Sequence, residues 1–135
     1  MNDREIKIQL LLTGNEIMSG DTVDSNSALI ARRLGELGLR VFRKVAVGDE
    51  VALLRQELTA MTDDADLVIV NGGLGPTVDD LTAEILAAVA GVGIEQHPEA
   101  VSHLESWCAG RNLPLNAANM KQAMLPAGAT VVDKP

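Results

Sequence analysis

Hydrophobic positions along the chain change repeatedly between a period of two and helical spacing, which is typical of alternating strands and helices. Apolar and polar residues alternate over residues 6–12 and again over residues 39–47, which predicts two strands. The second carries charge on both faces, so we expect it near an edge of the sheet. Residues 67–70 are apolar at every position, as expected of a strand covered on both faces. A further strand is expected at residues 129–132.

Helical spacing of apolar residues predicts four helices among these strands. Ser25 or Asn26 can cap the first helix, Gly38 closes it, and Pro98 opens the last. Residues 16–24 are expected to form a polar loop, and residues 113–126 a mixed loop with a short helix. The order of strands and helices predicts an α/β domain over residues 1–135, with a parallel sheet and helices on both faces. The apolar stripes of the four helices are Ile30, Leu34 and Leu37; Val51, Leu54, Leu58 and Met61; Leu81, Ile85 and Val89; and Val101, Leu104 and Cys108.

Composition narrows the classes of function. The chain has 135 residues, 47% of them hydrophobic, which is enough for one domain with a core. Its net charge of −8, with a single Trp, a single Phe and no Tyr, argues against nucleic acid as a partner. No apolar run approaches the roughly 20 residues of a membrane span, so no membrane association is expected. Cys108 is the only cysteine, which excludes an internal disulfide and favours the cytoplasm as the compartment.

A glycine-rich loop over residues 71–80 is the strongest candidate for chemistry. Ligands of open parallel sheets bind beyond the carboxyl ends of the strands, where this loop begins. Its glycines expose backbone N–H groups and a helix follows, so the loop predicts an anion cradle. Asp79 and Asp80 would repel a phosphate unless a cation intervened, and Mg²⁺ is the expected bridge. Alternatively, these carboxylates cap the helix together with Thr77. The candidate phosphate-binding residues here are Gly72, Gly73, Leu74, Gly75 and Thr77.

Two further loops follow expected strand ends. Asp49 comes after the strand of residues 39–47 and is either a helix cap or a metal ligand facing Asp80. The loop over residues 13–26 is long for a strand-to-helix connection and rich in side-chain oxygens. Glu16 and Asp24 are candidates for a general base. The candidate ligand-binding residues of this loop are Gly14, Asn15, Glu16, Asp24 and Asn26.

Four other residues give weaker signals. His97 is expected to be a cap or to face solvent, and Cys108 to lie in the core. Trp107 is expected to line a groove or an interface. Lys121 could reach a phosphate.

These loops resemble, in order, the N-terminal domain of the competence/damage-inducible CinA family. That domain is grouped with the Mog/MoaB proteins and the gephyrin G domain in the molybdopterin-binding superfamily. The string over residues 72–82 is highly specific, and the resemblance runs along almost the whole chain. The matching segments are Thr13-Gly14-Asn15-Glu16, Gly20, Asp24-Ser25-Asn26, Val47-Gly48-Asp49, Gly72-Gly73-Leu74-Gly75-Pro76-Thr77, Asp79-Asp80-Leu81-Thr82 and Asn119-x-x-Gln122-Ala123-x-Leu125-Pro126.

The resemblance implies a three-layer α/β/α sandwich with a mostly parallel sheet and a homo-oligomer, either a dimer or a trimer. Mog-like relatives adenylylate molybdopterin, whereas CinA-like relatives point to metal-dependent hydrolysis of the pyrophosphate in ADP-ribose. The Mog-like relatives use an Asp from each of two of these loops, and the matching positions, our catalytic candidates, are Asp49 and Asp80. We expect Asp49, Asp79 and Asp80 to hold the ion. The family continues beyond residue 135, so we expect a shortened C-terminus without the nicotinamide-nucleotide amidase domain. The alternatives are a pterin- or nucleotide-binding module of molybdenum cofactor biosynthesis without turnover, and an idle regulatory domain.

Overall fold

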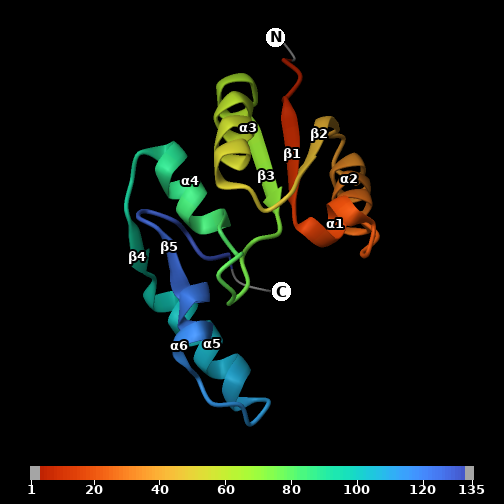
Figure 1. The fold of residues 1–135 in the computed structure, drawn as a ribbon. Helices are drawn as coiled ribbons and strands as arrows, with labels where there is room; N and C mark the ends of the chain where they lie inside the picture. The colour runs from red at the N-terminus through yellow and green to blue at the C-terminus, as the bar shows by residue number, and fades with distance from the viewer. Residues whose placement is uncertain (1–3, 133–135) are drawn as a thin grey trace. The chain divides into compact units, whose positions relative to one another are not determined.

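The first part of the chain builds a three-stranded parallel sheet with β1 at its centre, in the order β2-β1-β3. A computed structural model describes residues 4–132, which divide into two units at Gly73 and Leu74 (Figure 1). The first unit contains β1 (Ile8–Thr13), α1 (Asn15–Ser19), α2 (Asn26–Glu36), β2 (Val41–Val47), α3 (Val51–Asp64) and β3 (Leu67–Asn71). The second contains α4 (Thr82–Ala90), β4 (Ile94–Gln96), α5 (Pro98–Ala109), α6 (Ala117–Met120), the 3-10 helix η1 (Lys121–Ala123) and β5 (Met124–Pro126).

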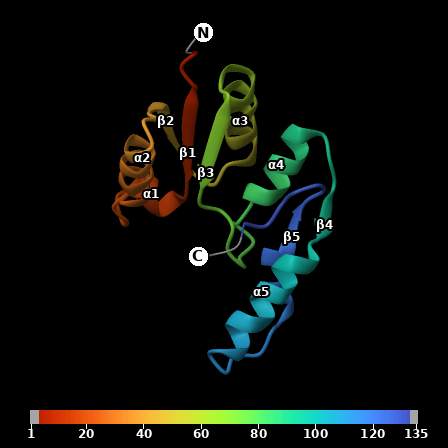
Figure 2. The same ribbon diagram turned by 180° about the vertical axis from the view of Figure 1, so that it is seen from behind.

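The connections of the first unit explain how its helices are placed. The chain leaves β1 for β2 on one side and then returns past β1 to β3 on the other. Parallel crossovers are right-handed, so a reversal of direction puts the two connecting helices on opposite faces of the sheet. Figures 1 and 2 show α2 and α3 on opposite sides of β1 accordingly. The predicted α/β fold with a mostly parallel sheet, and the edge position of residues 39–47, are therefore confirmed.

The core of the first unit lies around β1, whose six residues are all buried. From α3, three apolar residues of the predicted stripe are buried: Leu54, Leu58 and Met61. Gln9 is buried as well, and its Nε2 donates to Asp64 Oδ2 at 2.9 Å. This hydrogen bond compensates for part of the cost of removing a carboxamide from water. The central strand therefore has two covered faces, although its sequence alternates.

Two expectations about the first unit are wrong. Residues 67–70 were expected to be covered on both faces, but β3 is only partly buried and Leu67 is 46% exposed. The reason is that β3 forms an edge of the sheet within the described part of the chain. The polar loop expected at residues 16–24 begins with α1 instead. This helix has only five residues, none of them buried, so no apolar periodicity announces it.

The second unit carries a small antiparallel sheet in which β4 pairs with β5. The strand expected at residues 129–132 is absent: the chain turns at residues 127–128, where Ala129 N donates to Pro126 O at 3.0 Å, and residues 129–132 pair with no strand in the described part of the chain. His97 lies before Pro98, the first residue of α5, and its Nε2 contacts Ala129 O at 3.0 Å, so it does not simply face solvent. Cys108 is buried, as expected of a core residue. Among residues 4–132, no helix has the length and apolar character needed to span a membrane.

Candidate functional site

The carboxyl ends of the three parallel strands lie side by side at one edge of the sheet, which we call the carboxyl edge. Thr13 at the end of β1 is in register with Val47 at the end of β2, and Leu12 with Asn71 at the end of β3. In doubly wound sheets, ligands bind outside such ends where the direction of the connections reverses. Here the reversal occurs at β1. The topology therefore places a candidate ligand site at the carboxyl edge.

Asn15 and Asp49 join the ends of β1 and β2 through a reciprocal pair of hydrogen bonds. The backbone N–H of Asp49 donates to Asn15 Oδ1 at 2.9 Å, and the backbone N–H of Asn15 donates to Asp49 Oδ2 at 3.3 Å. The Thr13 hydroxyl lies 3.5 Å from Asp49 Oδ1. Asp49 is therefore not the cap of α3, whose N-cap position is Glu50. Its carboxylate is instead held at the carboxyl edge.

Glycines at the carboxyl edge allow other groups to approach the backbone. Gly14 has a φ of +144°, and a Cβ there would collide with the carboxylate of Glu16. Gly72 has a φ of +111°, and a Cβ there would collide with the backbone carbonyl of Thr13. Both glycines therefore occupy positions where a side chain would be strained and would also meet a neighbour. Glu16 consequently has its carboxylate close to the carboxyl edge.

Asp24 and Asn26 lie at the start of α2, near the same edge, but they make different contacts. Asp24 Oδ1 accepts from the Ser27 N–H at 3.0 Å, and its other oxygen accepts from the Ser27 hydroxyl. The bond from the hydroxyl lowers the pKa of Asp24 most, and the bond from the N–H lowers it further. Partial burial raises this pKa, and the charge of Lys44 lowers it, so the net change is downward. The side chain of Asp24 therefore supplies the capping hydrogen bond of α2, because Ser25 at the N-cap position makes none with its own side chain. Asn26 Nδ2 donates to Asn71 Oδ1 at 3.4 Å and links α2 to the end of β3.

The capping role of Asp24 predicts a pH-dependent loss of stability. Because the pKa of Asp24 is lowered in the folded state, its contribution is complete above the ordinary value of 3.8 and is lost as the pH falls through the folded pKa. Asp24→Ala should lower the free energy of unfolding by about 1 kcal/mol at pH 7, as for other lost caps. The difference from the wild type should shrink below about pH 4.

Urea denaturation followed by circular dichroism at neutral and acidic pH measures this difference. Asp63→Ala, which removes an exposed carboxylate from α3, is the matched control. An Asp24→Ala difference that stays constant down to acid pH would contradict the assignment of the cap.

In the second unit, Asp80 folds back onto its own loop. Asp80 Oδ2 accepts from the Thr77 N–H at 2.9 Å and from the Thr77 hydroxyl at 2.7 Å. A Cβ on Gly75 would lie 2.6 Å from the same oxygen, so a side chain there would displace the Asp80 carboxylate. Burial raises the pKa of Asp80, but the hydrogen bonds from Thr77 and Gly75, together with the charge of Lys121, outweigh it and lower the pKa overall. Asp80 is therefore ionised and does not cap α4, whose N-cap position is Leu81.

Lys121 and Gln122 of η1 hold the same loop by its carbonyl groups. Lys121 Nζ donates to Asp80 O at 2.6 Å and also to Thr77 O. Gln122 Nε2 lies 3.5 Å from Leu74 O. Two of the three donors of the Lys121 ammonium group are therefore engaged by carbonyl oxygens, and its reach to a phosphate stays a prediction. Together, Lys121 and Gln122 fix the shape of the glycine-rich loop.

The predicted site residues thus fall into two groups. The carboxyl edge brings together Gly14, Asn15, Glu16, Asp49 and Gly72, whereas Leu74, Gly75, Thr77 and Asp80 form the loop of the second unit. Asp79 is exposed. Across residues 4–132, no three His, Cys, Asp or Glu side chains form a group that could hold a metal ion. The action of Asp49 and Asp80 on one ion stays a prediction.

Sequence reasoning did not select Thr13 and Asn71 as site residues. Both are polar residues at the last position of a strand, and both contact predicted site residues. A polar residue at the end of a mainly apolar strand was the available signal.

Comparison with known proteins identifies the family. The profile of the family described as "Probable molybdopterin binding domain" matches residues 9–132, which lie in both units. The chain belongs to this family. Within it, a CinA-like protein of Colwellia psychrerythraea is 54% identical over 126 residues, covering 93% of this chain and 29% of that protein. The nicotinamide-nucleotide amidohydrolase PncC of Shewanella oneidensis is 39% identical over 130 residues, covering 96% of this chain and 31% of that protein.

Solved structures agree with the fold. CinA from Thermoplasma acidophilum matches with a TM-score of 0.79 at 30% identity, covering 90% of this chain and 71% of that one. MoaB from Thermus thermophilus, a molybdopterin biosynthesis enzyme, matches with a TM-score of 0.59 at 20% identity, covering 88% and 70%. The chain is thus a CinA-like molybdopterin-binding-type domain, and it spans about three tenths of the length of the curated relatives it matches.

Proposed function

We propose that this domain binds the diphosphate of an ADP-ribose-like nucleotide at the carboxyl edge and hydrolyses it with the help of a divalent metal ion. The observation that carries the proposal is the fixed carboxylate of Asp49. Asn15 and Thr13 hold it at the end of the parallel strands, beside Gly14 and Gly72, which let Glu16 and Thr13 come close to the backbone. Ligands of doubly wound sheets bind at this edge, outside the carboxyl ends of the strands.

The donor atoms at the carboxyl edge suit a hard cation. Mg²⁺ is commonly held by one or two carboxylates together with phosphate oxygens and water, so a three-residue protein cluster is not required. Asp49 is the proposed ligand in the first unit, and Asp79 and Asp80 are proposed as further carboxylates for the ion. When bound, such an ion polarises a phosphoryl oxygen and lowers the pKa of a coordinated water.

The other residues receive roles from their contacts. Backbone N–H groups of the glycine-rich segment, from Gly72 to Gly75, would stabilise charge developing on the phosphate, with that of Gly75 exchanging its hydrogen bond to Asp80 for one to the phosphate. Lys121 supports this by holding the carbonyl groups of the loop. Glu16 is the preferred general base, because its carboxylate lies over Gly14 at the carboxyl edge. Asp24 is a weaker candidate, because capping engages both of its oxygens and lowers its pKa.

A second candidate function is the binding of a pterin without turnover. The family description over residues 9–132, which names molybdopterin, favours it. The carboxyl edge would then act as a binding site alone. A homo-oligomer, either a dimer or a trimer, is proposed for both functions.

Incubation of the chain with ADP-ribose and Mg²⁺, followed by separation of the products, tests the leading proposal. Water cleaves the pyrophosphate bond, so AMP and ribose 5-phosphate should appear in equal amounts and should be suppressed by a chelator. Absence of AMP, together with saturable binding of a pterin by calorimetry, would favour the second function. AMP formation that is unaffected by the chelator would refute the role of the metal.

A further inference from the structure

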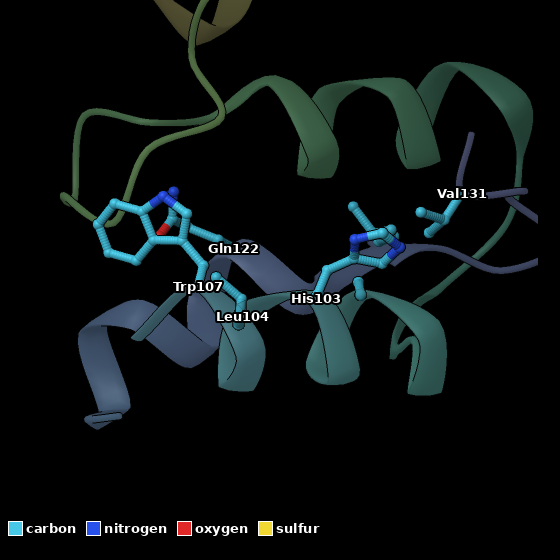
Figure 3. A pocket seen from close by; sticks show the side chains of 7 residues that line it. His103, Leu104, Trp107, Gln122 and Val131 are labelled. Carbon is cyan, nitrogen blue, oxygen red and sulfur yellow. The ribbon is translucent and has the colours of Figure 1, made fainter. Parts of the chain in front are cut away.

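A cavity of about 450 Å³ lies within the second unit, and none of its lining residues is assigned above to metal or phosphate. Its walls come from α5, η1, β5 and the segment after β5, and Figure 3 shows the side chains around it. A volume of 300–1,000 Å³ is typical of small-molecule sites. The residues on which the argument depends are His103, Leu104, Trp107, Gln122, Leu125 and Val131.

Trp107 gives the cavity a flat aromatic wall. It is the only tryptophan of a chain with no tyrosine, and it is 48% exposed. The guanidinium of Arg111 lies 4.3 Å from the centre of its ring, and this cation–π contact helps to orient the indole. An oriented, half-exposed indole offers a large apolar surface for stacking at low entropic cost.

The remaining walls combine apolar surface with a small number of polar groups. Leu104, Leu125 and Val131 supply aliphatic contacts, while His103 and the Gln122 carboxamide supply hydrogen-bonding groups. Small-molecule sites typically have this composition, in which the apolar walls bury the ligand and the polar groups fix its orientation. A flat bicyclic heterocycle with nitrogen atoms on its edge matches both kinds of wall. A purely aliphatic ligand would make no hydrogen bond to the carboxamide.

Gln122 also connects the cavity to the glycine-rich loop. Its Nε2 lies 3.5 Å from Leu74 O, and the preceding Lys121 binds the carbonyls of Thr77 and Asp80. A ligand in the cavity would therefore contact a residue that also contacts the loop. This link joins a heterocycle site to the segment that the proposed function assigns to phosphate.

We propose that the cavity between α5 and η1 binds the bicyclic nitrogen heterocycle, purine or pterin, of the domain's ligand. Trp107 stacks on the ring, and Gln122 bonds to its edge. The inference rests on the proposed function in one respect, which is that residues 72–80 bind the phosphate. The heterocycle site itself is testable without phosphate.

Tryptophan fluorescence tests the site directly, since Trp107 is the only tryptophan. Adenosine should quench or shift the emission with a saturable dependence, and ribose 5-phosphate should not. Binding of a pterin, measured by calorimetry, distinguishes the two sources of the heterocycle. Gln122→Leu should weaken binding about tenfold, as expected for a lost hydrogen bond. The matched Gln56→Leu on α3 should have no effect.

A second variant protects the test against a folding artefact. Ala100→Leu adds volume to the cavity wall, leaves Gln122 intact and should also abolish saturation. Lack of saturation by both adenosine and pterin would overturn the inference, whereas AMP formation from ADP-ribose would still support the proposed function. Emission that depends on protein concentration without any ligand would also overturn it, because a second copy would then cover the cavity.

Discussion

Gly72→Ala is expected to destabilise the domain by roughly 3–5 kcal/mol, a cost that combines a disfavoured backbone conformation with a clash in a packed region. The φ of +111° at Gly72 is rarely adopted by residues with a side chain, and the new Cβ would meet the carbonyl oxygen of Thr13. That oxygen belongs to the central strand, whose residues are all buried, so it cannot move aside cheaply. Thermal and urea denaturation measure the loss.

Substitutions at two other glycines of the same unit distinguish the conformational cost of Gly72→Ala from the cost of its clash. Gly38 has a φ of +74° but open space around it, so Gly38→Ala should show the conformational cost alone, about 1–2 kcal/mol. Gly35 lies inside α2 with open space, and Gly35→Ala should stabilise by up to about 1 kcal/mol. If Gly72→Ala cost no more than Gly38→Ala, the close approach of Gly72 to β1 would be refuted.

Asp49→Asn is expected to reduce hydrolysis of ADP-ribose about 100-fold or more while leaving the fold intact. Loss of groups that merely orient metal ligands costs 10–100-fold, so removal of the charge of a proposed ligand should cost at least as much. The asparagine oxygen can still accept from the Asn15 N–H, and the Asp49 N–H bond to Asn15 is a backbone contact that remains. Initial rates at saturating substrate, over a series of Mg²⁺ concentrations, measure the effect.

Asp63→Asn on α3 is the matched control for the charge change, because this exposed carboxylate takes no part in the proposed site. If a high Mg²⁺ concentration partly restored the rate of Asp49→Asn, the defect would lie in metal binding. Equal rates for Asp49→Asn and the wild type, with unchanged melting temperatures, would remove Asp49 from the reaction.

Much of the fold could be predicted because long apolar patterns report burial. The spacing of Leu54, Leu58 and Met61 predicted α3 and the face that it buries. The charged positions of residues 39–47 correctly indicated an edge strand. Short elements had no such signal: β4 and β5 have three residues each, and their pairing depends on a contact between distant segments.

The candidate site was predictable in its residue types but not in its contacts. Asp49 and Asp80 were each open to interpretation as helix caps, because an acidic residue before a helix has the same pattern in either role. The structure separates the roles: Asp49 binds Asn15 across two strands, and Asp80 binds Thr77 within its loop, while Asp24 is the actual cap. The pairing of Asp49 with Asn15 depends on where two strands end in space, which local sequence does not encode, whereas Thr77 was already a predicted partner of Asp80.

The central claim is that a divalent ion and a phosphate bind at the carboxyl edge through Asp49. The most direct measurement is the anomalous diffraction of crystals grown with Mn²⁺ and a non-hydrolysable ADP-ribose analogue. The account predicts an anomalous peak in contact with a carboxylate oxygen of Asp49 and with a phosphate oxygen of the analogue. A bound analogue whose phosphates lie elsewhere, with no peak at Asp49, would contradict it.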